Sequence, residues 1–221
     1  MEAQQEEKSL DRCSVAYFGD GASSTSDFHT ACNFAATLEC PVIFICRNNG
    51  LAISTPTRDQ YRGDGIISRT KGYGMAGIRV DGNDVFAMNA AIREARAYAI
   101  KHCKPIMVEA IAYRASHHTS LDDSTRYRNE DDVKEWSTKF DPVKRLYRFM
   151  YKEGLIDEEA NAEIKDEEQV AVLRAMEKAE NAAKPDLSYM FQDVYKNAPK
   201  HLEKQEKDLH DHLKNYGLHY K

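Results

Sequence analysis

Two short polar turns in the sequence carry residue types that can bind a divalent cation. The first is GDGA, around Asp20, and the second is RNNG, around Asn49. Asp20 offers a charged oxygen, Asn49 a neutral amide oxygen, and the turn after Asn49 a backbone carbonyl. Hard oxygen donors of this kind, too few to complete six-coordination, suit Mg²⁺ that is also bound to phosphate oxygens. Gly19 and Gly21 would leave room for a diphosphate to approach the backbone.

Each turn taken alone has a purely structural explanation. GDG and NNG are both common where a chain only changes direction. Here each follows an apolar run directly, and ligands of open parallel sheets bind at the carboxyl ends of the strands. The combination therefore favours one shared binding site over two unrelated turns.

The elements that must position these turns indicate an α/β fold. The runs SVAYF (14–18) and PVIFIC (41–46) have the composition of buried parallel strands. Between them, five side chains recur at helical spacing: Phe28, Ala31, Cys32, Ala35 and Leu38. This pattern predicts a helix over 27–39 with one apolar face, and so a β-α-β unit that places Asp20 and Asn49 at the ends of neighbouring strands.

The same alternation continues along the chain. Residues 77–84 predict a third strand, 85–102 an amphipathic helix, and 105–114 a fourth strand. Residues 115–129 form a polar loop that is too long for an ordinary connection, and loops of this length are often functional.

Helices dominate the rest of the chain. Asp141 is a predicted N-cap, with Pro142 as the first helical residue and Gly154 as the stop. Two further helices are predicted over 157–183 and 198–215. We expect an α/β domain over residues 1–130 and a helical carboxyl-terminal extension over 131–221.

Composition excludes several classes of partner. The net charge of −5, with acids and bases interleaved, argues against nucleic acid or an anionic membrane surface. No apolar stretch reaches the ~18 residues of a membrane span.

The five cysteines form no CxxC motif and are expected to be reduced core residues. The opening MEAQQEEKSL has no features of a signal or transit peptide.

A GDG turn followed by NN after one helix and one strand is the motif of thiamine diphosphate enzymes. Longer segments resemble the alpha subunits of branched-chain 2-oxo acid dehydrogenases, and these are YFGDGA, NFAATLECP, RNNGLAISTPT, QYRGDGI, RVDGNDVFA and YRASHHTSLDDSTRYR. The resemblance extends from about Cys13 to Tyr220. The AISTPT run favours this family over its pyruvate-specific relatives, which remain the alternative.

The resemblance implies a thiamine diphosphate-binding fold and a set of site residues. Asp20 and Asn49 would bind Mg²⁺ through their side chains and Leu51 through its carbonyl, although family members usually have tyrosine at that position. The implied contacts of the cofactor are Gly19, Asp20, Gly21, Ala22, Arg47, Asn49, Leu51, Ile53 and His118.

His118 is the catalytic candidate, because imidazole can donate or accept a proton near neutral pH. Its neighbour His117 is expected to fix the loop. Two adjacent histidines without a third ligand at a standard interval are weak support for zinc. Thr119 occupies the position of an inhibitory phosphoserine in the family, which implies a regulatory kinase as a partner.

The implied activity is oxidative decarboxylation of branched-chain 2-oxo acids, as by 3-methyl-2-oxobutanoate dehydrogenase, with acyl transfer to lipoamide. The implied partners are a beta subunit, in an alpha2beta2 heterotetramer, and a lipoyl-bearing acyltransferase core in the mitochondrial matrix. The beta chain would supply the glutamate that activates the cofactor.

The sequence also departs from the family pattern. Thr25 and Ser26 stand where a Glu or Gln and a Gly are usual, and the amino-terminal half of the family's alpha subunit has no counterpart. We therefore expect a truncated chain without a targeting segment, inactive alone, with a non-catalytic assembly subunit as the second alternative.

Overall fold

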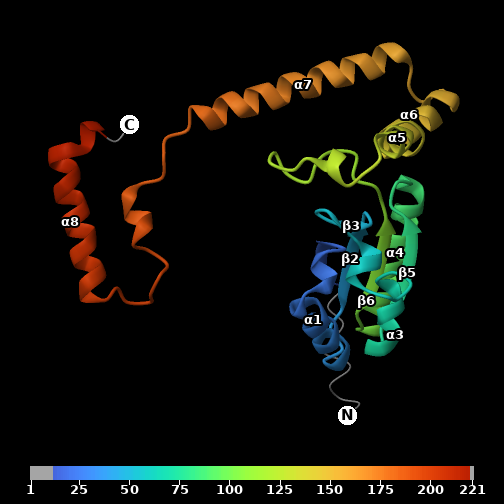
Figure 1. Ribbon diagram of the computed structural model, residues 1–221, viewed down its shortest axis with the longest axis horizontal. Coiled ribbons are helices and arrows are strands. Elements are labelled where there is room, and N and C mark those ends of the chain that lie inside the picture. Colours follow the sequence, from blue (N-terminus) through green and yellow to red (C-terminus); the bar gives the residue numbers. More distant parts are fainter. Residues whose placement is uncertain (1–11, 220–221) are drawn as a thin grey trace. The chain divides into compact units, whose positions relative to one another are not determined.

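Four parallel strands form the central sheet in the computed structural model, which describes residues 12–219. They are β1 (Ser14–Gly19), β2 (Val42–Asn48), β5 (Ala76–Asp81) and β6 (Ile106–Ile111). Their order in the sheet is β1-β2-β6-β5 (Figure 1). The predicted parallel α/β sheet is confirmed, and each of the four predicted strands is present.

Helices pack on both faces of this sheet, as the alternation of side chains along β2 requires. Phe44 faces a cluster that contains Phe28 and Cys32 of α1 (Ser26–Thr37). Ile43, on the other face, packs with Ala95 and Ala99 of α4 (Val85–His102). The core therefore consists of two apolar layers, one on each side of β2 and β6.

The strand predicted over residues 14–18 is present, but the prediction that it is buried is wrong. Val15 is 47% exposed and Tyr17 is 78% exposed. Strand β1 is an edge strand of the described sheet, and only its other face, with Ala16 and Phe18, packs against the α1 side of the core. The predicted apolar face of α1 is also only partly buried.

On that helix, Phe28, Cys32 and Ala35 are buried, whereas Ala31 and Leu38 are exposed. The predicted helical spacing is confirmed, but the buried stripe on α1 is narrower than predicted.

Between β2 and β5 the chain forms short elements that the sequence did not predict. Strands β3 (Leu51–Ala52) and β4 (Thr55–Pro56) form an antiparallel hairpin. Helix α2 (Thr57–Gln60) follows, then a 3-10 turn and α3 (Thr70–Tyr73). Elements of two to four residues have no room for a periodic hydrophobic pattern.

After β6 the chain passes through the polar loop, which contains a 3-10 turn (Ser124–Arg126). Helix α5 (Glu130–Glu135), a π-helical turn (Trp136–Phe140) and α6 (Pro142–Lys152) follow. The cap of α6 is confirmed, because the Asp141 side chain accepts a hydrogen bond from the Lys144 backbone N–H.

Side chains of the sheet region hold these helices in place. Arg145 of α6 lies 2.7 Å from Asp81 and 3.1 Å from Asp84. Trp136 stacks on Tyr113 with ring centroids 4.9 Å apart and an interplanar angle of 4°. Trp136 therefore serves as a packing residue between the π-helical turn and the segment after β6.

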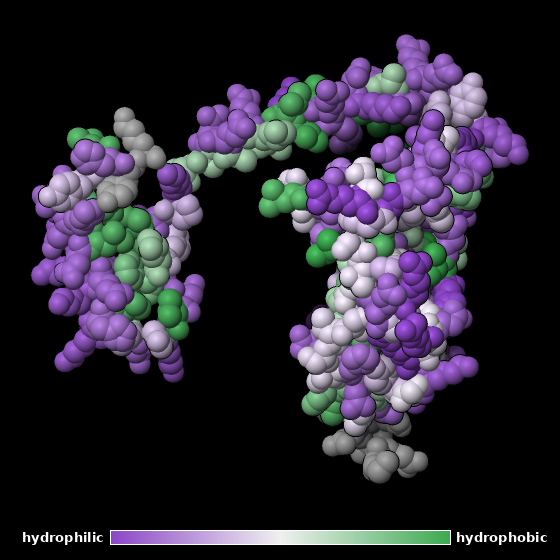
Figure 2. Space-filling model, in the orientation of Figure 1, coloured by the Kyte–Doolittle hydropathy of each residue, from purple (hydrophilic) through white to green (hydrophobic). Residues whose placement is uncertain are grey.

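A second compact unit begins at Glu158. It contains α7 (Glu158–Glu180), a 3-10 turn (Leu187–Met190), α8 (Lys200–Tyr216) and a final 3-10 turn (Gly217–His219). Its helices expose mostly hydrophilic side chains (Figure 2). The predicted boundary between a cofactor-binding domain (1–130) and an extension (131–221) stays a prediction.

All five cysteines are free, and Cys32 and Cys46 are buried. Burial raises the pKa of the Cys32 thiol to about 11, so this side chain stays a neutral core residue. No helix among residues 12–219 is long and apolar enough to cross a membrane. The prediction about a targeting segment concerns residues 1–10, which lie outside the described residues.

Candidate functional site

The sheet brings the two polar turns to one edge. In the parallel pairing of β1 with β2, Gly19 lies opposite Arg47. Asp20 and Asn49 therefore follow the carboxyl ends of adjacent strands, which lie about 4.8 Å apart in a sheet. Neighbouring strands thus deliver the two predicted Mg²⁺ ligands to one edge.

The glycines of the first turn have different roles. A Cβ on Gly19 would meet nothing within 4 Å, so this position leaves open space beside the turn. A Cβ on Gly21 would lie 2.8 Å from the Cβ of Ala52 in strand β3. The missing side chain of Gly21 therefore lets the turn pack against the hairpin. The expected approach of a diphosphate to the backbone of both glycines stays a prediction. Ala22 begins the 3-10 turn Ala22–Ser24.

Asp20 is almost completely buried, with 1% of its surface exposed. Its Oδ2 accepts a hydrogen bond from the side-chain amide of Gln60, at 3.0 Å. Its backbone carbonyl accepts hydrogen bonds from the Ser23 hydroxyl at 2.6 Å and the Ser23 N–H at 3.1 Å. The Gln60 amide therefore restrains the carboxylate, and Ser23 fixes the backbone of the turn that follows β1.

The two adjacent asparagines do different things. The Asn49 amide oxygen accepts a hydrogen bond from the Leu51 N–H at 3.1 Å. A carbonyl oxygen has two lone pairs, so this bond leaves one for a cation. The Asn48 oxygen accepts from the Gly50 N–H at 3.0 Å, and its amide nitrogen donates to Glu109 at 2.8 Å. Asn48 thus anchors the turn, and Asn49 can face a ligand.

Glu109 of β6 is a residue that the sequence analysis missed. It is fully buried, and its Oε1 accepts hydrogen bonds from Asn48 and from the Ile66 N–H. Its Oε2 accepts from the Ile67 N–H and from Arg79 Nε at 3.0 Å. The one signal for it was a single acid within the apolar run PIMVEAIAY.

The β3–β4 hairpin carries backbone strain at Ile53. Its φ of +56° lies in the left-handed region, which a β-branched residue rarely adopts. Its carbonyl accepts a hydrogen bond from Arg114 at 2.9 Å, and its side chain is exposed. A contact from the end of β6 therefore helps to hold the strained turn beside the polar edge.

Arg114 also begins the network that orders the long polar loop. Its guanidinium donates to the Tyr127 hydroxyl at 2.7 Å, and Tyr127 donates to Asp122 Oδ2 at 2.5 Å. The same Asp122 oxygen accepts a hydrogen bond from the His118 backbone N–H at 2.8 Å. These contacts connect the hairpin at Ile53 to the backbone of His118.

Electrostatics support this network at neutral pH. The hydrogen bonds from Tyr127 and from the His118 N–H hold the pKa of Asp122 below its ordinary value. Burial, and then the hydrogen bond to Asp122, raise the pKa of Tyr127. The carboxylate therefore stays charged and the phenol stays protonated, as the hydrogen bond between them requires.

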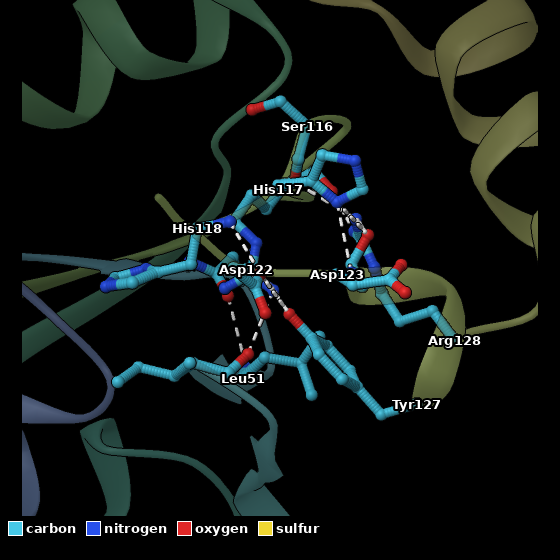
Figure 3. A network of polar contacts seen from close by, with 12 residues as sticks. Leu51, Ser116, His117, His118, Asp122, Asp123, Tyr127 and Arg128 are labelled. Carbon is cyan, nitrogen blue, oxygen red and sulfur yellow. Dashed lines mark hydrogen bonds and ion pairs between the residues drawn. The ribbon is translucent and has the colours of Figure 1, made fainter. Parts of the chain in front are cut away.

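The two histidines of the loop point in opposite directions (Figure 3). His117 Nδ1 accepts a hydrogen bond from the Ser124 N–H at 3.0 Å, so its proton must be on Nε2 when the ring is neutral. His117 therefore fixes the loop, as predicted. The imidazole of His118 lies outside the hydrogen-bonded network, on the side of the Leu51 side chain in this view.

The arrangement fits the implied cofactor. Asp20, Asn49 and the Leu51 carbonyl could supply three oxygen ligands, and a Mg²⁺ held by them would need its remaining ligands from phosphate and water. No cluster of three or more His, Cys, Asp or Glu side chains suited to a metal occurs among residues 12–219. Arg47 is exposed at the end of β2, where its charge can meet a diphosphate.

Comparison with known proteins gives a consistent result. A family model described as "Dehydrogenase E1 component" matches residues 1–188. The mitochondrial 2-oxoisovalerate dehydrogenase subunit alpha of Homo sapiens is 48% identical over 209 residues, which are 95% of this chain and 47% of the human protein. The Caenorhabditis elegans protein of the same name is 44% identical over 216 residues, or 98% of this chain and 50% of that protein.

A plant relative extends the comparison. The 2-oxoisovalerate dehydrogenase subunit alpha 2, mitochondrial, of Arabidopsis thaliana is 45% identical over 196 residues, which are 89% of this chain and 42% of the plant protein. The chain therefore spans about half the length of the curated relatives it matches. With the parallel sheet described above, the family match confirms the predicted fold class.

Proposed function

Because the chain belongs to the dehydrogenase E1 component family, we propose that it is part of the alpha subunit of a branched-chain 2-oxo acid dehydrogenase. The reaction would be thiamine diphosphate-dependent oxidative decarboxylation of a branched-chain 2-oxo acid, with acyl transfer to lipoamide. The main support is the similarity of almost the whole chain to 2-oxoisovalerate dehydrogenase alpha subunits. The substrate in that name is itself a branched-chain 2-oxo acid.

In this proposal the edge formed by the two turns holds Mg²⁺ and the diphosphate. Asp20, Asn49 and the carbonyl of Leu51 are the metal ligands, and Arg47 neutralises phosphate charge. The backbone of the GDGA turn and the exposed side chain of Ile53 complete the binding surface. Glu109 and Asn48 hold the second turn in the geometry that this surface needs.

His118 is the proposed catalytic residue. Thiamine diphosphate, when bound, would supply the electron sink for decarboxylation. His118 would accept or donate a proton at the reacting end of the cofactor, since its imidazole lies outside the loop network. Asp122 holds the His118 backbone and so limits where the ring can lie.

Several partners follow from the proposal. A beta subunit, in an alpha2beta2 assembly, would contribute the glutamate that activates the cofactor, and a lipoyl-bearing acyltransferase would accept the acyl group. The mitochondrial relatives favour the mitochondrial matrix as the location. A phosphate on the exposed Thr119 would add about two negative charges beside His118, so a regulatory kinase is also proposed.

Binding and turnover together test this function. The chain would be assembled with a beta subunit, and thiamine diphosphate binding would be measured by calorimetry with and without Mg²⁺. Turnover of 3-methyl-2-oxobutanoate would then be compared with turnover of pyruvate, in assays that contain an artificial electron acceptor. We expect Mg²⁺-dependent binding, preference for the branched substrate, and no turnover by the chain alone.

Each other outcome identifies an alternative. Preference for pyruvate would indicate a pyruvate dehydrogenase-type alpha subunit. Assembly with the beta subunit but no cofactor binding would indicate a non-catalytic assembly subunit. Turnover by the chain alone would contradict the division of the site between two subunits.

A further inference from the structure

The side-chain amide of Gln60 connects three segments of the candidate site. Its Nε2 donates one hydrogen bond to Asp20 Oδ2 at 3.0 Å and another to the Thr55 carbonyl of strand β4 at 3.1 Å. Its Oε1 accepts a hydrogen bond from the Ser24 hydroxyl at 3.1 Å. Gln60 lies at the end of α2, so a short helix reaches both the GDGA turn and the hairpin.

These partners determine which way the amide points. The Asp20 carboxylate and the Thr55 carbonyl can only accept hydrogen bonds, so both must face the NH₂ group of Gln60. The Ser24 hydroxyl can donate, so it faces the oxygen. A flipped amide would place an oxygen against two acceptors, which the network does not permit.

A hydrogen bond to one carboxylate oxygen controls the direction of the other. With Oδ2 held by Gln60, rotation of the buried Asp20 carboxylate is restricted, and Oδ1 is aimed in one direction. A carboxylate that binds a cation through one oxygen is commonly held in this way through its second oxygen. The same amide holds Thr55, in the hairpin that bears Leu51, whose carbonyl is the third proposed metal ligand.

We propose that Gln60 is a positioning residue for the metal site: it aims the Asp20 carboxylate and fixes its place relative to the hairpin. This inference rests on the proposed function. Loss of a partner that orients a metal ligand typically costs about 10–100-fold in metal affinity. The effect should fall on Mg²⁺ affinity and not on the number of cofactor sites.

Two variants and one control test the role in the complete assembly with the beta subunit. Gln60→Ala removes the amide, and Gln60→Glu replaces a donor by a second carboxylate facing Asp20 and Thr55. The control, Asp59→Asn, changes an exposed side chain one position away in the same helix. Thiamine diphosphate binding is titrated with Mg²⁺ by calorimetry, and Mn²⁺ binding is followed by electron paramagnetic resonance.

We expect the Mg²⁺ concentration for half-maximal cofactor binding to rise about 10–100-fold in Gln60→Ala and at least as much in Gln60→Glu. Saturating Mg²⁺ should restore full cofactor occupancy in Gln60→Ala, which a folding defect would not permit. The Mn²⁺ spectrum should change in both variants, and Asp59→Asn should match the wild type.

Three results would overturn the inference. Unchanged Mg²⁺ dependence in both variants would leave the proposed function intact but exclude a positioning role for Gln60. Tighter Mg²⁺ binding in Gln60→Glu would mean that residue 60 reaches the cation itself. No Mg²⁺-dependent cofactor binding by the wild-type assembly would reject the proposed function and the role of Gln60 with it.

Discussion

Replacing Glu109 with glutamine alters one atom of a fully buried side chain, yet it should strongly destabilise the protein. The two carboxylate oxygens accept four hydrogen bonds, two at each oxygen. An NH₂ group in place of Oε1 would face two donors, the Ile66 N–H and the Asn48 side-chain amide. An NH₂ group at Oε2 would face the Ile67 N–H and Arg79. In either orientation two donors lose their acceptor.

The expected cost follows from that count. Hydrogen bonds to a charged group contribute about 1.5–3 kcal/mol each, so two lost bonds lower the free energy of unfolding by about 3–6 kcal/mol. Asn48 cannot compensate by flipping, because its oxygen already accepts from the Gly50 N–H. At about 2–4 °C per kcal/mol for a chain of this size, the melting temperature should fall by about 6–24 °C.

Thermal and urea denaturation of the assembled protein, followed by far-ultraviolet circular dichroism, would measure the effect. Glu94→Gln is the matched control, because Glu94 is an exposed residue of α4. The control should shift the unfolding free energy by less than about 0.5 kcal/mol. A cost below about 1 kcal/mol for Glu109→Gln would refute the view that this carboxylate holds the second turn.

The remaining predictions concern the site itself. Asp20→Ala removes the one charged ligand of the proposed metal, so it should weaken Mg²⁺-dependent thiamine diphosphate binding more than about 100-fold. Calorimetry would measure this, and near-normal affinity would reject Asp20 as a metal ligand. His118→Ala should reduce turnover much more than cofactor affinity in steady-state and binding assays, and wild-type turnover would exclude its catalytic role. Since the folded-state pKa of Asp122 is lowered, its contribution to loop order should be complete above about pH 4 and disappear as the pH falls through that lowered pKa. Hydrogen exchange at the His118 amide, corrected for its intrinsic rate, would measure this, and an Asp122→Asn variant should lose the pH dependence.

The strands and long helices were predictable because their side chains repeat with a clear period. Helix α4 was predicted over 85–102, the bounds it has in the structure. The positions of Asp20 and Asn49 at one sheet edge followed from the same pattern. The resemblance to branched-chain 2-oxo acid dehydrogenase alpha subunits, drawn from short motifs, is confirmed by the family match and the identities.

What the sequence did not predict depends on contacts between distant segments. Glu109 bonds Asn48, 61 positions away, and Gln60 bonds Asp20, 40 positions away. Gln60 begins the segment QYRGDGI, but the resemblance does not say which groups its side chain contacts. The exposure of Tyr17 depends on which strand lies at the sheet edge, which composition does not encode. The β3–β4 hairpin is too short for periodicity, and its strained residue, Ile53, does not have the residue type that normally signals a left-handed turn.

The stack between Trp136 and Tyr113 gives the chain a built-in optical reporter. Trp136 is the one tryptophan in the sequence, and Tyr113 directly precedes Arg114, from which the loop network begins. Arg128, which also binds the Ser116 carbonyl in the loop, lies over the Tyr113 ring at 5.6 Å. Tryptophan fluorescence therefore comes from a ring adjoining the loop that carries His118, so ordering of that loop can be followed without an added label.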